Sequence, residues 1–270
     1  MTASLWYRPE VLVFAFPADP LTSRRVDEYF APQRDALREG GFSGIVLPPD
    51  VFRVPTHIGG VPPAAVVVYR GWMLDQNEYA SFASSVTESG GVPHTSLEQY
   101  LLAHHLPNWY RLIPDLTPET VVLPADVDLQ AELERLNWPA FFIKDYVKSL
   151  KTTAGSLITT PGEAKRVVDD MRKFRGTIEG GLCVRRVERF LPDSETRYFV
   201  VHGRSFACED TEVPSIVKEV AARIEHPFFS VDVATTETGE QRVVEIGDGQ
   251  VSDLVGWSAA RFVRMWQHTA

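Results

Sequence analysis

The 270-residue sequence contains little cysteine, and this scarcity narrows the class of protein. Its two cysteines, Cys183 and Cys208, lie far apart and stand beside apolar residues. A disulfide framework and a CxxC metal knuckle are therefore excluded. The sequence also lacks an apolar run of membrane-spanning length, and its first residues show no basic segment followed by an apolar one. We expect a cytoplasmic protein with no membrane partner.

Basic residues are outnumbered by acidic ones. Lys and Arg total 27 against 36 Asp and Glu, which gives a formal net charge of -9. Such a chain lacks the general positive field that holds a nucleic-acid backbone, so its charge argues against nucleic acid as a partner. With 44% hydrophobic and 23% charged residues, the composition is that of a globular protein with a substantial core.

The first half of the sequence alternates short apolar runs with helical patterns, which favours a parallel-sheet α/β lobe. Residues 64–69 are rich in β-branched side chains and predict a central strand that Arg70 follows directly. In such sheets the ligand crevice lies at the carboxyl ends of the strands, so the polar loop that begins at Arg70 is expected to face this crevice. Helices are predicted over 23–39, 74–88 and 96–106, and residues 114–124 have the prolines typical of a connector.

The second half becomes rich in strands, which favours α+β architecture. Strands are predicted from residue 141 and over 156–159, 182–187, 196–202, 204–209, 228–235 and 241–246, with helices over 126–136, 160–172, 214–224 and 253–266.

An apolar strand that ends in lysines is the first chemical signal. Lys144 and Lys148 follow Phe141–Ile143, and Ser, Thr and Gly residues come just after. An ammonium group at the end of a buried strand is costly unless it meets an anion, and phosphate suits a lysine beside a loop of backbone donors. The alternative is that both lysines are ordinary surface charges.

Two carboxylates on consecutive strands are the second signal. Asp232 and Glu245 lie on strands that form a predicted hairpin, where they could share one face. Magnesium binds a few carboxylate oxygens and completes its coordination with phosphate and water, so this pair suits it. The alternative is exposed acids that pair with Arg242 or Lys218.

A strand, loop and second strand form the third signal. Arg186–Glu188 end one apolar strand, and Arg197 begins the next. Backbone groups of such a hinge could hold a flat heterocycle, and Arg197 could meet a phosphate. Structural salt bridges are the alternative explanation.

Together these segments resemble the ATP-grasp superfamily, and within it a compact clade named for its arginine and lysine residues. The resemblance rests on Phe-Ile-Lys-Asp-Tyr-Val-Lys-Ser at 142–149, Glu-Thr-Arg-Tyr-Phe-Val-Val at 195–201 and Val-Glu-Ile-Gly-Asp-Gly-Gln at 244–250. It extends to Tyr-Arg-Gly-Trp-Met-Leu at 69–74 and so covers most of the chain. It implies two α+β lobes that sandwich ATP, over 114–181 and 182–270, preceded by a small α/β pre-ATP-grasp lobe over 1–113.

The resemblance also implies residue roles. ATP phosphates would be bound by Lys144, Lys148 and Arg197, adenine by Arg186, Val187 and Glu188, and Mg2+ by Asp232 and Glu245. The superfamily often has Asn two residues after the metal-binding Glu, where this chain has Gly247, so Asp248 is the candidate third ligand. Arg197, Lys148 and Arg70 are the candidate catalytic residues, and Arg70 is the candidate to grip the acceptor carboxylate.

The implied function is a ligase that uses ATP to activate a small-molecule carboxylate as an acylphosphate, which an amine then attacks to form an amide, ADP and phosphate. Two alternatives stay open: modification of a protein or nucleic-acid end, and nucleotide sensing without turnover. The sequence does not predict the acceptor or the oligomeric state.

Overall fold

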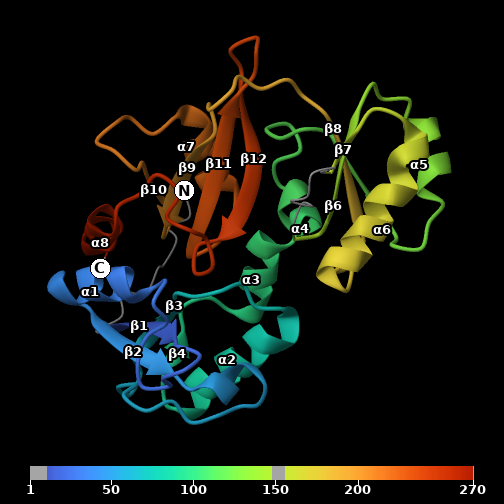
Figure 1. The fold of residues 1–270 in the computed structure, drawn as a ribbon. Coiled ribbons are helices and arrows are strands. Elements are labelled where there is room, and N and C mark those ends of the chain that lie inside the picture. Colours follow the sequence, from blue (N-terminus) through green and yellow to red (C-terminus); the bar gives the residue numbers. More distant parts are fainter. Residues whose placement is uncertain (1–10, 148–155, 270) are drawn as a thin grey trace. The chain divides into compact units, whose positions relative to one another are not determined.

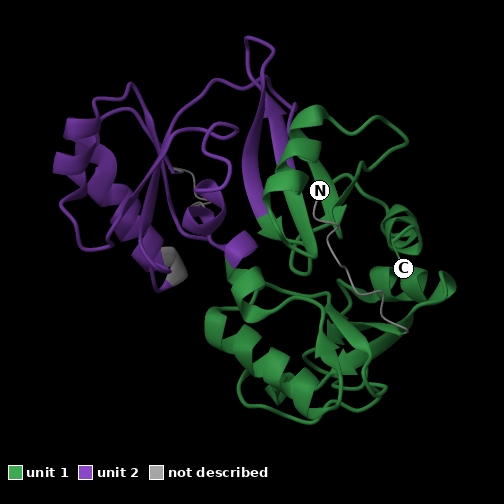
Figure 2. Ribbon diagram, turned by 180° about the vertical axis from the view of Figure 1, so that it is seen from behind, with its two compact units in different colours: residues 1–101, 196–231, 247–270 green, residues 102–195, 232–246 purple. Residues whose placement is uncertain are grey.

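The computed structural model describes residues 11–147 and 156–269 (Figure 1). The chain forms two compact units. Unit 1 comprises Met1–Leu101, Thr196–Val231 and Gly247–Ala270, and unit 2 comprises Leu102–Glu195 and Asp232–Ile246 (Figure 2). Each unit is therefore built from segments that are distant in the sequence.

The strands of the described residues are β1 Leu12–Pro17, β2 Ser43–Leu47, β3 Val66–Tyr69, β4 Val92–Pro93, β5 Thr120–Leu123, β6 Phe141–Asp145, β7 Leu157–Ile158, β8 Leu182–Arg186, β9 Thr196–Val201, β10 Arg204–Phe206, β11 Phe228–Thr235 and β12 Gln241–Asp248. The helices are α1 Ala31–Glu39, α2 Gln76–Glu88, α3 Leu97–His104, α4 Leu106–Tyr110, α5 Leu129–Leu136, α6 Ala164–Arg175, α7 Ser215–Arg223 and α8 Ala259–Gln267, with short 3-10 helices η1 Pro49–Phe52 and η2 Pro161–Glu163.

Unit 1 contains a parallel four-stranded sheet of order β2-β1-β3-β4. Its central strands are almost wholly apolar and buried, as expected of parallel strands that are covered on both faces. α2 begins with a complete capping box, in which Asp75 accepts from the backbone of Glu78 and the Glu78 side chain accepts from the backbone of Asp75. The predicted parallel α/β lobe is confirmed.

Unit 2 contains a sheet of order β5-β8-β6-β7, in which β5 pairs with β8, and β6 with both β7 and β8, in antiparallel fashion. Helices α5 and α6 cover one of its faces through a core that includes Leu133, Val167 and Ile143 (Figure 1). Strand β5 lies inside the segment predicted to be a connector, so that prediction was wrong. Its Thr-Val-Val-Leu run pairs with β8 at the edge of the sheet, where flanking prolines cost no ladder hydrogen bond.

The third sheet has the order β10-β9-β11-β12, and the unit boundaries fall within β11 and β12. The helix predicted from residue 253 begins only at Ala259. Gly256 adopts φ +75°, which interrupts a helix, and the Ser258 side chain caps α8 by accepting from the backbone of Arg261. Residues 253–255 therefore belong to a loop.

Across the residues described, none of the helices combines the length and apolar character needed to cross a lipid bilayer.

Candidate functional site

The face of the unit 2 sheet that does not contact α5 and α6 carries cations. Side chains alternate along a strand, so Phe141, Ile143 and Val184 enter the helix-covered core while Lys144 and Arg185 lie on the opposite face. Pairing between β6 and β8 sets Phe142 opposite Arg185 and Lys144 opposite Cys183. Two cations on neighbouring strands of one face make it a candidate anion-binding surface.

Lys144 is buried and reaches a carboxylate. Its side chain is 6% exposed, and its Nζ donates to Glu245 Oε1 at 3.0 Å. Because an isolated buried ammonium group is costly, this contact explains how the strand tolerates it. The Glu245 side chain is 45% exposed, so the pair joins a buried cation to an acid that solvent reaches.

Arg185 is a site residue that the sequence analysis did not single out. It donates to Val244 O and to Thr117 Oγ1, both at 2.6 Å. Burial lowers its pKa to about 10, so the guanidinium is charged at neutral pH. The sequence signal that could have identified Arg185 was its position in an otherwise apolar strand, on the same face of the sheet as the predicted site residue Lys144.

Cys183 lies between these cations in the sheet but offers no activated nucleophile. Burial raises the pKa of its thiol to about 12. The thiol therefore stays protonated at neutral pH, where a nucleophilic cysteine requires thiolate.

The predicted hinge over Arg186–Glu188 is held by contacts inside unit 2. Arg186 N donates to Glu119 O at 2.8 Å. Glu188 accepts from Arg242 Nε and Nη2, each at 2.9 Å, and Arg242 also donates to the carbonyls of Asp115 and Thr117. Arg242 takes both Glu188 oxygens, and Val187 N donates to Ala140 O at 3.4 Å. The Glu188 side chain and both of these backbone amides therefore already have partners inside unit 2, and the adenine role of the hinge stays a prediction.

Two of the predicted metal ligands belong to unit 2. Asp232 on β11 is 3% exposed, and Glu245 lies on β12, the neighbouring strand. Carboxylate oxygens on adjacent strands are the donor set that Mg2+ prefers, so these residues fit the ion. The described residues contain no cluster of three or more His, Cys, Asp or Glu side chains with metal-ligand geometry.

Asp248, the predicted third ligand, is fully buried in unit 1. Its Oδ1 accepts from Gln250 N at 2.9 Å and Gln250 Nε2 at 3.2 Å, and its Oδ2 lies 3.2 Å from His226 Nε2. A Cβ added at Gly247 would lie 2.9 Å from Ser252 Oγ and 3.1 Å from Ser230 Oγ. An Asn at 247 would therefore displace this pair of hydroxyls, which gives a physical reason for the glycine. The metal role of Asp248 stays a prediction.

Arg70 and Arg197 also belong to unit 1. Arg70 is buried, donates to Gln33 Oε1, Gly249 O and Ser252 O, and lies over the Phe262 ring. These contacts favour a structural role for Arg70, which joins the end of β3 to the segment after β12. The predicted contact of Arg70 with an acceptor carboxylate stays a prediction. Arg197 Nη1 donates to Asp253 O at 3.0 Å. Lys148 lies outside the described residues.

Comparisons with protein-family models and with solved structures show which proteins this chain is similar to. A family model for the ATP-grasp domain, that of the third family in the clade named for its arginine and lysine residues, matches residues 116–266. The D-cycloserine synthetase DcsG structure is similar at 15% identity and a TM-score of 0.63, covering 95% of this chain and 99% of that chain. A RimK domain ATP-grasp protein from Sphaerobacter thermophilus DSM 20745 gives 14% identity and 0.62, covering 94% and 98%.

Macrocyclase MdnC bound with precursor peptide MdnA, from Microcystis aeruginosa MRC, gives 11% identity and a TM-score of 0.61, covering 96% of this chain and 99% of that chain. Likeness at such low identity establishes a shared fold, and it confirms the predicted ATP-grasp fold class. A search of curated protein sequences finds no match.

Proposed function

This chain belongs to the third family of the ATP-grasp clade that is named for its arginine and lysine residues, and we propose on that basis that it is an ATP- and magnesium-dependent ligase that joins a carboxylate to an amine. The observation that carries the proposal is the buried Lys144 paired with Glu245 on one face of the unit 2 sheet. Phosphate oxygens would take the place of Glu245 beside Lys144, and Glu245 would then be available to Mg2+. Arg197 and Lys148 are proposed as further phosphate contacts.

The proposed reaction has two steps. A carboxylate oxygen attacks the γ-phosphorus of ATP, the bond to ADP breaks, and an acylphosphate forms. The amine then attacks the acyl carbon, phosphate leaves with the carbon–oxygen bond electrons, and the amine gives up a proton. Lys144 would stabilise charge on the phosphoryl oxygens, and magnesium, when bound by Asp232 and Glu245, would add Lewis-acid stabilisation of the same charge.

The first test is product analysis. The protein is incubated with ATP, Mg2+ and a panel of carboxylates with amines, amino acids and short peptides, and we expect ADP and phosphate together with an amide product. Release of AMP and pyrophosphate would contradict the acylphosphate route.

Variants test the site itself. Lys144→Ala should weaken ATP binding about tenfold or more, because a charge-assisted contact to phosphate is lost. Glu245→Gln should raise the Mg2+ concentration needed for turnover. Lys165→Ala is the matched control, since the Lys165 side chain is 84% exposed and pairs with Asp169. An equal loss of ATP affinity in Lys165→Ala and in Lys144→Ala would contradict the assignment of Lys144 to the ATP site.

Two alternatives are separated by the same assays. Because the MdnC structure contains a precursor peptide, a peptide or protein acceptor is a second candidate, and turnover confined to peptides in the panel would favour it. Thermal stabilisation by ATP and Mg2+ without ADP release in any mixture would favour nucleotide sensing. Labelled nucleic-acid ends are added to the acceptor panel, and their modification would favour a nucleic-acid acceptor.

A further inference from the structure

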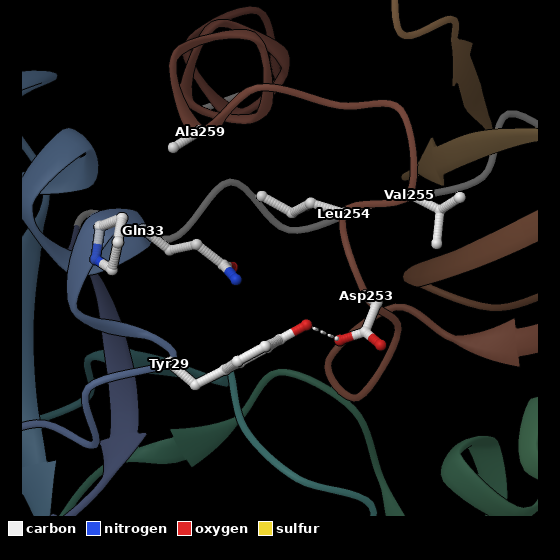
Figure 3. A pocket seen from close by; sticks show the side chains of 7 residues that line it. Tyr29, Gln33, Asp253, Leu254, Val255 and Ala259 are labelled. Carbon is white, nitrogen blue, oxygen red and sulfur yellow. Dashed lines mark hydrogen bonds between the residues drawn. The ribbon is translucent and has the colours of Figure 1, made fainter.

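Unit 1 contains a pocket that the proposed ATP chemistry does not use. It has a volume of about 370 Å³ and is lined by Tyr29, Pro32, Gln33, Asp253, Leu254, Val255 and Ala259 (Figure 3). The pocket lies between the start of α1, the loop over 253–255 and the first residue of α8. Its volume is near the lower end of the range for ligand sites, about 300–1,000 Å³, which suits a small molecule.

The carboxylate of Asp253 is held in a defined position. Tyr29 Oη donates to Asp253 Oδ1 at 3.1 Å, as Figure 3 shows. This hydrogen bond raises the pKa of Tyr29, so the phenol stays a neutral donor. Asp253 is the charged residue among the seven that line the pocket. The buried Arg70 guanidinium behind Gln33 interacts with the same carboxylate and offsets part of its field. The charged group that a ligand in the pocket would contact is still the Asp253 carboxylate, and an ammonium group is its complement.

Gln33 contributes a fixed amide. It is 6% exposed, and its Oε1 accepts from Arg70 Nε at 3.1 Å and Arg70 Nη2 at 2.8 Å. Because arginine can only donate, these contacts fix which end of the amide is oxygen. The amide end of Gln33 points into the pocket (Figure 3). Its Nε2 is thereby available as a donor for an acceptor atom of a ligand.

The remaining walls are apolar. Pro32, Leu254, Val255 and Ala259 give hydrocarbon surface, and the Tyr29 ring adds an aromatic face that can attract a cation. An anchored carboxylate, one amide donor and apolar walls together match an ammonium group on a small body that carries a hydrogen-bond acceptor.

The pocket loop is also tied to a proposed phosphate contact. Arg197 Nη1 donates to Asp253 O, and Trp257 Nε1 donates to Arg197 O, both at 3.0 Å and all within unit 1. Asp253, which supplies the pocket charge, is therefore itself a hydrogen-bond partner of Arg197 through its backbone carbonyl.

We propose that this pocket binds a small primary amine as its ammonium ion, with the Asp253 carboxylate as the anchor and the Gln33 amide contacting an acceptor atom of the ligand. That the pocket holds the amine substrate rests on the ligase function proposed above, whereas ammonium binding by the pocket does not depend on that function. The amine could be a free amino acid derivative or the N-terminus of a peptide, because both present the same group.

The test is calorimetric titration of the full chain without ATP. The probes are L-alaninamide, L-alanyl-L-alanine, N-acetyl-L-alaninamide and propionate. We expect binding of the compounds with a free ammonium group and at least about tenfold weaker binding of the acetylated one, because the charged contact to Asp253 is lost. Tighter binding of alanyl-alanine than of alaninamide would identify a peptide N-terminus as the better source.

Variants locate the contact. Asp253→Asn should weaken alaninamide binding about tenfold with an unchanged melting temperature. Tyr29→Phe keeps the charge but loses the hydrogen bond to it, so a smaller loss is expected. Asp50→Asn also removes one exposed acid in unit 1 but does not line the pocket, and binding should be unchanged. If the melting temperature of Asp253→Asn falls below that of the parent, the pocket assignment is judged from Tyr29→Phe and from the acetylated probe instead.

Failure of the pocket and failure of the ligase give different results. Equal affinity for the acetylated probe, preference for propionate, or unchanged binding in Asp253→Asn overturns the pocket assignment, whatever the ATP assays show. Ammonium binding that depends on Asp253, with no ADP release from any mixture, supports the pocket and overturns the ligase proposal.

Discussion

Single buried charges account for much of the chemistry at the residue scale. Lys144 and Arg185 stand on the same face of one sheet, but their partners differ in kind. Lys144 contacts a partly exposed carboxylate, whereas Arg185 contacts a backbone carbonyl and a hydroxyl. A phosphate could replace the carboxylate beside Lys144, but the contacts of Arg185 belong to the fold of unit 2. We therefore expect the two cations to respond differently to substitution.

Arg185→Ala should reduce the free energy of unfolding by about 2–4 kcal/mol, because it removes two buried hydrogen bonds and leaves a cavity. Urea denaturation measures this. The adjacent Arg186→Ala is the matched control, since the Arg186 side chain is 52% exposed and its ion pair with Glu119 spans 3.5 Å. A change within about 0.5 kcal/mol is expected there. Similar losses in both variants would show that the Arg185 contacts contribute nothing specific.

A pair of histidines gives unit 1 a pH-dependent stability. His94 Nε2 and His202 Nε2 lie 3.5 Å apart. Burial lowers the pKa of both rings, that of His94 well below its ordinary value, with further contributions to His94 from the charges of His202 and His226. Below about pH 6.5, the ordinary pKa of histidine, the unfolded chain therefore binds more protons than the folded one, and stability is lost as the pH falls towards the folded pKa values.

Replacing His94 should flatten this dependence. One histidine that stays neutral in the folded state costs about 1.4 kcal/mol of stability by about pH 5.5, from the linkage between proton binding and folding. His94→Gln should therefore lose about 1 kcal/mol less than the parent between about pH 7.5 and 5.5 in urea titrations. His57→Gln, at an exposed position, should follow the parent curve. Parallel curves for His94→Gln and the parent would contradict the prediction.

At the scale of elements, α2 has a complete N-terminal capping box in its own sequence. Asp75 accepts from the backbones of Asn77 and Glu78, which satisfies two donors of the first turn. Asp75→Ala should cost about 1 kcal/mol of unfolding free energy, while Asp75→Asn, which keeps an acceptor oxygen, should cost less. Chemical denaturation followed by far-UV circular dichroism compares the two. A loss in the Asn variant as large as in the Ala variant would mean that the cap is not the cause.

Elements that depend on pairing partners were harder to predict. The Thr120–Leu123 run is too short to distinguish a strand from a connector, and β8, its partner, lies about sixty residues further along the sequence. The start of α8 was placed too early because Asp253 and the apolar residues after it suit a first helical turn, whereas Gly256 and Ser258 set the true start. The long runs that became β3, β9, β11 and β12 were predicted correctly since their composition alone favours strands.

At the scale of the whole molecule, the fold class followed from the sequence but the parts played by several charges did not. Arg70 looked like a ligand contact because it ends a parallel strand. Its partners Gly249 and Ser252 come from the far end of the sequence, and no local pattern reveals them. Asp248 likewise meets His226 only in the folded chain. Lys144 and Glu245, in contrast, were each singled out by a motif of their own, but their ion pair with one another was not predicted and is seen only in the folded chain.

The two ends of the Gln33 amide have a consequence for how this protein could change its ligand over evolution. One end satisfies the buried guanidinium of Arg70, so a substitution at 33 would disturb folding before it altered selectivity. Leu254 also packs against the hydrophobic core, whereas Val255 and Ala259 line the pocket outside that core. We expect natural variation in ligand preference to accumulate at positions 255 and 259, and Gln33 to vary only together with Arg70.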